Sequence, residues 1–405
     1  MADPQPFGVA PLEAINYLKT KLDIPTAAWT DIWQGMHARA FVVAGAQSSA
    51  LLADFHDAVT KAIETGSTIE EFRKDFDRIV ATHGWSYKGS RGWRSAVIFN
   101  TNLRMAYSAG RWAQAQTTKT VRPYLRYVAI LDSRTRPQHR AWHGTVLNMD
   151  DDWWHTHMPP NGWNCRCTVQ TLSDGDLKRY GLHVSPSAPP SPTVQATIST
   201  PSGPVTVEVP EGVDPGFGYN PGEAGFGRGA ETVALERHGT WEPLSAPGAP
   251  QVKLSPLPVD VHAGTPPATS DPTKLRDMLR SAIGGDEAVF VDPTGARTLV
   301  GQAIVDHMLE DPSRIDGRER YFDLIPSLIT DPAEIWIGWA ANSASGRVMM
   351  RRRYVKLVMI DKTRAIGLVA DQDGGFWSGM TFFRGKLAAL NRLRAGLRVF
   401  ARKEN

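Results

Sequence analysis

The chain has 405 residues, too many for one ordinary hydrophobic core, so we expect two or three domains. Its 41% hydrophobic and 21% charged residues, with a net charge of +3, argue against a wholly disordered protein and a uniformly basic nucleic-acid coat. The sequence offers neither the run of about eighteen apolar residues that a membrane span needs nor a signal-peptide start. We therefore expect a protein without a membrane segment that stays in the cytoplasm where it is made.

Residues 1–120 have the pattern of a helical region. Leu51 and Phe55 belong to a run of apolar residues at helical spacing, and Thr68 with Glu71 resembles a capping box that opens a second helix. A third long helix is predicted in "SAVIFNTNLRMAYSAGRWAQAQ". Its interspersed polar residues are either partner contacts or an ordinary solvated face.

The residue pattern changes at residue 121, and residues 121–183 predict a small α+β module. The module opens with the apolar, β-branched and aromatic run "RPYLRYVAILDSRTRP" and closes with the short helix "SDGDLKRYGL", which has a Ser cap and a Gly stop.

Residues 184–271 read as a proline-rich and glycine-rich linker. They hold more than half of the chain's 29 prolines, together with many Gly, Ser and Thr. The stretch "VTVEVPEGVDPGFGYNPG" alternates enough to form a short hairpin or a docking segment.

Residues 272–405 predict a second globular unit, in which helices come first and apolar strands separated by turns follow. This order is typical of an α+β domain with an antiparallel sheet. The fold class expected for the chain is therefore multidomain: a helical N-terminal region, a small α+β module, a Pro-rich linker and a C-terminal α+β domain.

Both cysteines lie in "PPNGWNCRC". In an extended strand Cys165 and Cys167 point to the same face, where a disulfide would be strained but two thiolates could share a zinc ion. His139 and His143 are four residues apart, a spacing that presents two imidazoles to one metal on a helical turn. A structural zinc site built from these four residues and a purely packed, hydrogen-bonded core both remain open. No base with an orienting partner is evident, which disfavours a catalytic cysteine.

The end of the chain is strongly basic. From residue 346 onward it has fourteen Lys and Arg against four acids, a local charge of +10. Such a surface attracts polyanions and positions their phosphates. The candidate nucleic-acid contacts are Arg351, Arg352, Lys356 and Arg394, with Trp377 as a stacking surface. A solvated basic face is the alternative reading.

Metal-independent RNA cleavage needs a base, an acid and groups that stabilise the crowded phosphate. His307, the only histidine of the predicted C-terminal domain, is the first candidate for base or acid, and Glu334 is the second. Arg353 and Tyr354 would hold the phosphate and a base or proton, and Thr381 could donate to a phosphate oxygen. Each of these residues also has an ordinary structural reading. No carboxylate cluster has metal spacing here, so no cofactor is expected for catalysis.

The motifs "LDSRTRPQHRAWHG" and "DDDWWHTHMPPNGWNCRCTVQTLSDGDL" resemble the Mu F-like minor head proteins, the phage head-morphogenesis family, over roughly residues 30–182. The resemblance implies a phage or prophage protein that assembles proheads near the portal, with portal, capsid or scaffold proteins and packaged DNA as partners. It also implies a location in the host bacterial cytoplasm during assembly and then inside the virion head. Related proteins have Cys at the positions of Arg136 and His139, a pattern that looks like a metal knuckle. Here only His139 keeps ligand chemistry, unless His143 or Asp132 substitutes for the missing ligand.

Residues 285–400 resemble the phage-borne barnase/EndoU/colicin/RelE-like nucleases through "DHMLEDPSRIDGRERYFDLIPSLITDPAEIW", "RRRYVKL", "GFWSGMTFF" and "LNRLRAGLRVF". The resemblance implies a BECR-like fold and a toxin-like, metal-independent endoribonuclease acting on RNA such as tRNA. Two alternatives remain open: a module without catalysis that binds packaged DNA or a capsid surface, and an inert capsid spacer.

Overall fold

The computed structural model divides the chain into two compact units. It describes residues 11–249, 254, 256–261, 267–359, 363–373, 376–385, 391 and 393–402. The N-terminal unit comprises Met1–Thr240, Ser245–Pro250 and Ala341–Val348, and the C-terminal unit comprises Trp241–Leu244, Gln251–Ala340 and Met349–Asn405. Among the described residues, none of the helices combines the length and the apolar character that crossing a membrane requires.

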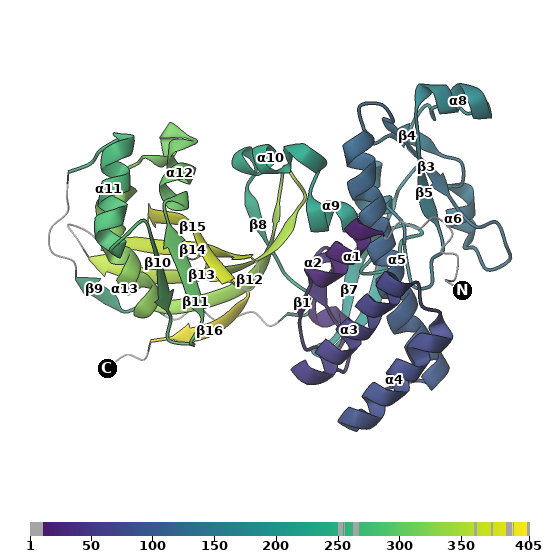
Figure 1. Cartoon of the computed structure of the whole chain (residues 1–405), viewed down its shortest axis with the longest axis horizontal. Helices are drawn as coiled ribbons and strands as arrows, with labels where there is room; N and C mark the ends of the chain where they lie inside the picture. The colour runs from purple at the N-terminus through teal and green to yellow at the C-terminus, as the bar shows by residue number, and fades with distance from the viewer. Residues whose placement is uncertain are drawn as a thin grey trace, which may run out of the picture. The chain divides into compact units, whose positions relative to one another are not determined.

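The predicted helical hairpin forms in the N-terminal unit (Figure 1). Helix α3 (Ser49–Thr65) ends at Gly66 in the left-handed conformation, and α4 (Ile69–His83) begins with a capping box. There, the Glu71 backbone N–H donates to the Thr68 hydroxyl over 3.3 Å, and the Thr68 N–H donates to the Glu71 carboxylate over 2.7 Å. Both devices satisfy backbone groups that a helix end leaves unpaired, so the hairpin is fixed locally.

The long helix α5 (Arg91–Thr118) packs against α1, α4 and α9 in the same unit. The short helices α1, which precedes α5 in the chain, and α9, which follows it, are among these partners. The remaining helices and short strands up to residue 180 are α1 (Leu12–Lys19), β1 (Leu22–Asp23), η1 (Trp29–Asp31), α2 (Met36–Arg39), β2 (Ala40–Phe41), α6 (Pro137–Ala141), α7 (Trp153–His157) and α8 (Asp174–Tyr180).

A three-stranded antiparallel sheet forms the predicted small module. Its order is β4 (Val146–Asn148), β3 (Tyr124–Val128) and β5 (Thr168–Leu172). Side chains alternate along the central strand, so that Leu125 and Tyr127 are fully buried while their neighbours are half-buried. The strand lies within the apolar, β-branched and aromatic run from which the sequence predicted the start of this module.

Residues 184–240 fold as part of the N-terminal unit, so the prediction of a linker over 184–271 is wrong for this part. The segment forms a hairpin of β6 (Thr193–Thr200) and β7 (Gly203–Pro210), followed by α9 (Pro221–Phe226), η2 (Gly229–Glu231) and α10 (Thr232–His238). Phe217 and Tyr219 are buried. A Cβ at Gly222 would lie 2.2 Å from the Cβ of Trp112, so this glycine permits close packing of α9 on α5. Here glycine therefore serves close approach rather than chain flexibility.

The described residues of the C-terminal unit form a nine-stranded, mainly antiparallel sheet. Its main path runs β10-β11-β15-β14-β13-β12-β16, with β8 paired to β12 and β9 paired to β13. The strands are β8 (Trp241–Leu244), β9 (Val259–Val261), β10 (Glu287–Val291), β11 (Arg297–Gly301), β12 (Glu334–Asn342), β13 (Val348–Met359), β14 (Thr363–Asp373), β15 (Phe376–Gly385) and β16 (Leu397–Ala401). Because β8 and β9 come from the predicted linker, the predicted start of this domain at residue 272 is also wrong.

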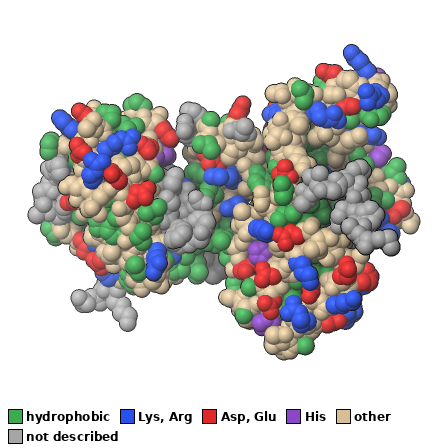
Figure 2. All heavy atoms as spheres, viewed as in Figure 1, with side chains coloured by type: hydrophobic (Ala, Val, Ile, Leu, Met, Phe, Trp, Pro, Cys, Tyr) green, Lys and Arg blue, Asp and Glu red, His purple; other side chains and the backbone are tan. Residues whose placement is uncertain are grey.

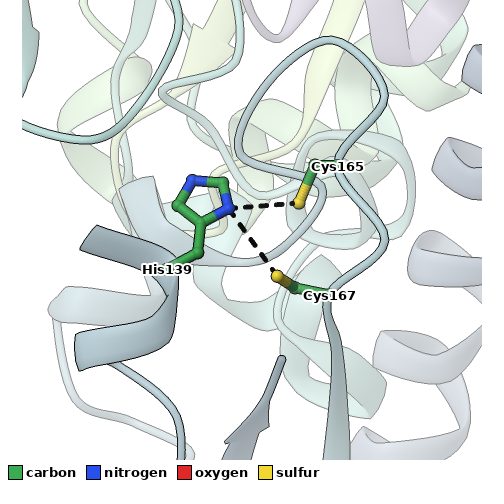
Figure 3. Close-up of side chains that lie close together, drawn as sticks. All are labelled: His139, Cys165 and Cys167. Carbon is green, nitrogen blue, oxygen red and sulfur yellow. Dashed lines mark hydrogen bonds between the residues drawn. The ribbon is translucent and has the colours of Figure 1, made fainter. Parts of the chain in front are cut away.

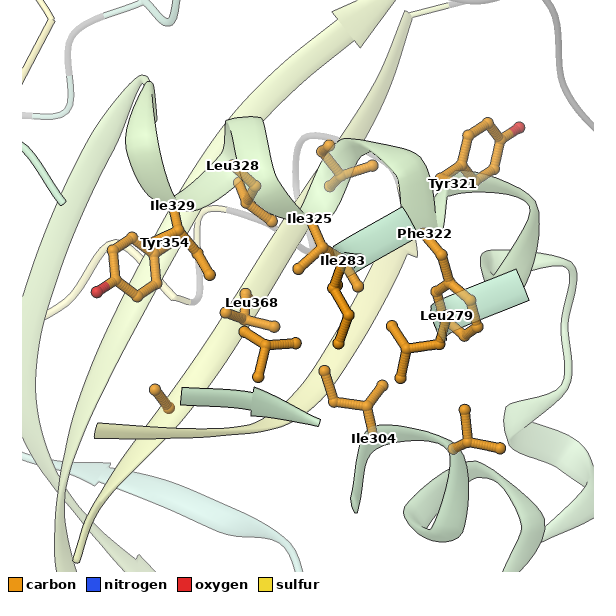
Figure 4. Close-up of a cluster of buried hydrophobic side chains, with 14 of the residues drawn as sticks. Leu279, Ile283, Ile304, Tyr321, Phe322, Ile325, Leu328, Ile329, Tyr354 and Leu368 are labelled. Atoms are coloured by element: carbon orange, nitrogen blue, oxygen red, sulfur yellow. The ribbon is translucent and has the colours of Figure 1, made fainter. Parts of the chain in front are cut away.

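Helices cover one face of this sheet and enclose its main core. They are α11 (Pro272–Ile283), α12 (Ala303–Leu309), η3 (Pro312–Arg314), η4 (Arg318–Leu324) and α13 (Ile325–Thr330). Figure 4 shows Leu279 and Phe322 of this layer facing Leu368 of β14 across the core. Ile335 of β12 belongs to the same buried cluster. The predicted α+β class with an antiparallel sheet is confirmed at this level.

Candidate functional site

His139, Cys165 and Cys167 form a compact cluster in the N-terminal unit (Figure 3). The Nδ1 atom of His139 lies 3.6 Å from the Sγ atoms of both cysteines. One potential ligand atom from each residue lies within 4.8 Å of the others, and His139 and Cys165 are buried. The sequence predicted the meeting of these three side chains, and the structure brings them together.

The orientation of His139 is set by a residue far along the chain. Its Nε2 atom lies 2.9 Å from the carbonyl oxygen of Gly212, to which an Nε2–H can donate. Such a hydrogen bond leaves the Nδ1 lone pair directed at the thiols, which is the arrangement expected of a metal-binding imidazole. Pro137 at the start of α6 fixes the short helix that carries this ring.

Three chain segments around the cluster are tied together by ion pairs and hydrogen bonds. Arg166 forms two bonds with the Asp132 carboxylate, of 2.8 and 2.6 Å. Arg136 forms an ion pair of 2.7 Å with Asp214, whose carboxylate also accepts from the Trp163 backbone N–H over 2.9 Å. Arg136 belongs to the motif that contains His139, and Trp163 belongs to the motif that contains the two cysteines. Both motifs are therefore connected to the segment around residue 214.

His143 is not a member of this cluster, so that part of the predicted ligand set is wrong. Helix α6 ends at Ala141, and the His143 ring lies beyond it, where its Nδ1 accepts from the Ala129 backbone N–H over 3.1 Å. The four-residue spacing places two imidazoles on one face only while the helix continues. Asp132, the other potential substitute ligand, is engaged by Arg166 instead.

The separations of His139 from the two cysteines match the spacing of ligands in a tetrahedral zinc site. With Zn–S distances of about 2.3 Å and Zn–N distances of about 2.0 Å, ligand nitrogen and sulfur atoms in a tetrahedron lie roughly 3.5 Å apart. The observed separations of His139 Nδ1 from both sulfurs are 3.6 Å. A hydrogen bond from the Cys167 thiol lowers the pKa of Cys165, and the adjacent Cys165 in turn raises the pKa of Cys167. One thiol of the pair thus ionises readily.

The predicted nucleic-acid-binding cations of the C-terminal unit are buried and already paired. Arg352 binds the buried Asp292, with Nε 2.8 Å from the carboxylate, and Lys356 reaches the Asp331 carboxylate over 3.2 Å. Arg351 lies 4.4 Å above the ring of Trp241. These three predicted nucleic-acid contacts are therefore not part of an exposed basic surface in this structure. On the face shown in Figure 2, acidic and basic side chains are interspersed.

Tyr354 and Arg352 project together from β13 into one buried network. The Tyr354 hydroxyl lies 2.9 Å from the Asp292 carboxylate, 2.7 Å from the Thr298 hydroxyl and 3.0 Å from the Nε of Arg352. Burial raises the pKa of Tyr354 above its ordinary value. Tyr354 is fully buried and belongs to the hydrophobic core, so the network has the character of a structural element.

Glu334 and Arg394, two further candidates, form a separate buried cluster on the opposite sheet face. The Glu334 carboxylate accepts from Arg394 over 2.6 and 2.8 Å, from Arg398 over 3.1 Å and from the Trp336 indole over 2.7 Å. Burial opposes ionisation of Glu334, but the hydrogen bonds from Arg394 and Trp336 outweigh it and lower its pKa. Arg353 donates to the Ala395 carbonyl oxygen over 3.1 Å.

His307 lies in the helix layer, away from Glu334. Its helix contributes Ile304 and Met308 to the core, which Ile335 enters from β12. Glu334 points to the other sheet face because neighbouring strand residues alternate. The His307 ring lies 3.1 Å from Arg314, and its pKa is lowered by burial and then by that guanidinium. His307 and Glu334 are therefore not brought to one site.

Trp377 and Thr381 lie on β15, where the structure describes the strand but not these two side chains. Their predicted roles fall outside the described part of the molecule. Sequence reasoning missed Gly212 and Asp214, whose signal was the "GVDPG" stretch, and Asp292, which stands in an ordinary turn with no special signal.

Two regions of the chain match models of known families. Residues 53–170 match the family described as Phage Mu protein F like protein. Residues 274–401 match the family described as phage-Barnase-EndoU-ColicinE5/D-RelE like nuclease2.

Three relatives are similar over parts of their length. "Putative capsid assembly protein F" of Escherichia phage Mu is 37% identical over 243 residues, which is 54% of this chain and 55% of the relative. The Mu-like prophage FluMu F protein of Haemophilus influenzae is 34% identical over 220 residues, 49% of this chain and 53% of the relative. The minor head protein GP7 of Bacillus phage SPP1 is 36% identical over 81 residues, 17% of this chain and 26% of the relative. The chain thus spans about half the length of the first two relatives. No solved structure matches the chain.

Proposed function

The chain joins a Phage Mu protein F like region to a phage nuclease-like region, and from this pairing we propose a minor head protein that acts in prohead assembly near the portal. The observation that carries the proposal is the 37% identity to a protein named for capsid assembly, together with similarity to a minor head protein of a second phage. Portal, capsid or scaffold proteins are the proposed partners, and packaged DNA is the proposed nucleic acid. The proposed locations are the host cytoplasm during assembly and then the head interior.

Deleting the reading frame from the phage or prophage that carries it tests this role. We expect fewer DNA-filled heads in electron micrographs of lysates and recovery when the intact chain is supplied from a plasmid. A normal yield of filled heads, with the chain absent from purified virions of the parent phage, would overturn the proposal.

For the C-terminal unit we propose a metal-independent ribonuclease. Residues 274–401 match a nuclease family, and Glu334 gathers Arg394 and Arg398 on the sheet face opposite the helices. Glu334 is ionised at neutral pH, as a base that takes a proton from a ribose hydroxyl must be, although the hydrogen bonds that lower its pKa also weaken it as a base. Arg398, with a side chain 30% exposed, is the proposed cation that would leave Glu334 to meet a phosphate.

The test incubates the full chain with total RNA in the presence of EDTA. Glu334→Gln should lower the cleavage rate by about 10²–10⁴-fold, the usual contribution of a general base. Arg398→Gln is the second variant, because it leaves the buried Glu334–Arg394 pair intact. Glu287→Gln, a change at an exposed position of β10, is the matched control. Equal melting temperatures would show that the variants are folded.

The outcomes separate the competing functions. Loss of cleavage in His307→Ala with full activity in Glu334→Gln would place the chemistry on the helix side and overturn our assignment. Intact RNA that is nevertheless bound would favour the alternative, a catalytically inactive module for packaged DNA or a capsid surface. Neither cleavage nor binding would leave an inert spacer.

We also propose that His139, Cys165 and Cys167 hold a structural zinc ion. The match between the observed 3.6 Å separations and tetrahedral ligand spacing supports this, as does the Gly212 carbonyl behind the imidazole. The ion would draw α6, the cysteine loop and the start of β5 together. A fourth ligand would come from outside these three residues.

A further inference from the structure

The N-terminal unit contains a pocket of about 350 Å³ that is not part of the cysteine cluster. Part of the lining comes from the stretch that begins at Ala40 and ends at Ala44, and part comes from the face of α5 from Trp93 to Met105. Trp29, Trp163 and Phe217 form much of the remaining lining. The volume lies in the range of ligand pockets, and an aromatic lining suits an apolar guest.

Two cations, Lys21 and Arg94, line this mainly apolar pocket, whose other polar side chains are the uncharged Thr101, Asn102 and Asn164 and the imidazole of His37. Each is 8% exposed. The Lys21 ammonium donates to the His37 carbonyl oxygen over 2.8 Å, and Arg94 donates to the Ala44 carbonyl oxygen. Within the described residues, no carboxylate lies within ion-pair distance of either charge, and the Nε of Arg94 is buried without a hydrogen-bond partner.

Leaving two buried cations without a counter-charge is unfavourable, because burial removes the water that would solvate them. The effect is visible at Lys21, where burial and the nearby Arg39 lower the pKa to about 7. Residues that serve packing alone would be better replaced by apolar side chains of similar size. The backbone carbonyl oxygens and the rings of Tyr17 and Trp85, which Lys21 and Arg94 contact, offset this cost in part, and an anionic guest would offset the rest.

We propose that this pocket binds an acidic, apolar segment of a partner protein, with a carboxylate between Lys21 and Arg94 and apolar side chains against the tryptophans. Charge complementarity identifies the occupant, since the apolar walls exclude a highly hydrated inorganic anion and the cations disfavour a purely apolar guest. Trp93, 52% exposed at the N-terminal end of α5, lies at the pocket and is available to the arriving segment. The inference does not depend on the proposed head-assembly role.

The test uses the full chain and two pairs of probes. The first pair is 1-anilinonaphthalene-8-sulfonate, an aromatic anion, and N-phenyl-1-naphthylamine, its uncharged counterpart. The second pair is the peptide acetyl-Leu-Trp-Asp-Leu-amide and its Asn analogue, used to displace the sulfonate. Lys21→Met and Arg94→Gln remove the two charges. Arg91→Gln on the same helix, which breaks an exposed ion pair with Asp77, is the matched control.

We expect Lys21→Met and Arg94→Gln each to weaken sulfonate binding about tenfold, the effect of losing roughly 1.4 kcal/mol. Binding of the uncharged dye should be unchanged, as should every affinity in the control variant. The Asp peptide should displace the sulfonate at least about tenfold better than the Asn peptide. Melting curves identify any variant that fails to fold, in which case the other variant decides.

Equal sulfonate affinity in the wild type and the folded charge variants would overturn the site. Failure of the Asp peptide to displace a charge-dependent dye would overturn the protein segment as occupant. A tenfold gain in peptide affinity on deleting residues 1–10 would identify the chain's own N-terminal segment as the occupant and likewise overturn the proposal.

Discussion

The Nε2 atom of His139 lies 2.9 Å from the carbonyl oxygen of Gly212, although 73 residues separate them in the chain. This contact makes the segment after β7 part of the cysteine cluster. It also directs the other ring nitrogen toward the two thiols. The metal proposal therefore depends on a segment whose composition is that of a linker.

We predict about one zinc ion per chain in protein purified without chelator, measured by mass spectrometry of the metal. Cys167→Ser should lose the ion and lower the melting temperature by roughly 5 °C or more. Chelator should have the same effect on the wild type. His143→Gln is the control, because His143 lies outside the cluster and the ion should remain bound. Metal-free protein whose melting is indifferent to chelator would refute the site.

Close packing of α9 on α5 predicts a large effect of one methyl group. Gly222→Ala should destabilise the N-terminal unit by about 1–3 kcal/mol, because the new Cβ would meet Trp112 at 2.2 Å. Gly175 occupies the same second position of a helix, α8, where a Cβ meets its nearest atom at 3.6 Å. Gly175→Ala should therefore be neutral or stabilising by up to about 1 kcal/mol. Denaturant unfolding compares the two variants, and equal stabilities would mean that residues 221–226 do not pack on α5.

The buried pair of Asp292 and Arg352 predicts a strong destabilisation of the C-terminal unit. Asp292→Asn leaves the Arg352 charge uncompensated and should cost about 3–5 kcal/mol in unfolding free energy. Asp286→Asn, which removes an exposed partner of Arg280, should cost less than about 1 kcal/mol. A similar cost for both variants would show that burial of the first pair has no energetic consequence.

The same aspartate predicts acid sensitivity. Burial opposes ionisation of Asp292, but the Thr294 hydroxyl and the charge of Arg352 outweigh it and lower its pKa. Its stabilising contribution is therefore complete above the unfolded pKa of about 3.9 and is lost as pH falls through the lower folded value. The unfolding free energies of wild type and Asp292→Asn should converge in that acidic range.

His155 predicts the opposite pH dependence in the N-terminal unit. A hydrogen bond to Glu223, 2.7 Å long, raises the pKa of His155 despite the opposing effect of burial. The protonated ring therefore stabilises the fold fully below the unfolded pKa of about 6.5, and this contribution is lost as pH rises through the raised folded value. The stability difference between wild type and His155→Gln should shrink over that interval. His183→Gln, a change at an exposed histidine, should show no such trend.

Local signals made part of the fold predictable. The capping box of Thr68 and Glu71 and the stop at Gly66 act between neighbours in sequence, so the hairpin of α3 and α4 could be found. The glycines after residue 210 could not be interpreted in that way. Gly222 is required by Trp112, which is distant in sequence, and composition does not distinguish such a glycine from one in a flexible linker.

In the candidate sites, too, local features could be predicted and contacts between distant residues could not. Cys165 and Cys167 could be paired with His139 from their chemistry, whereas excluding His143 required knowing where α6 ends. Arg352 is a candidate nucleic-acid contact by sequence alone, because its counter-charge, Asp292, lies 60 residues earlier in the chain. Buried ion pairs between distant strands leave no local trace in the sequence.

The basic side chains that pair with carboxylates inside the fold affect how the binding of RNA would depend on salt. A cation that releases no counterion on meeting a phosphate adds nothing to the slope of log affinity against log salt. Arg352, Lys356 and Arg394 already balance carboxylates within the protein. RNA bound by this chain should therefore respond to added salt far less steeply than the formal charge of +10 after residue 346 would suggest.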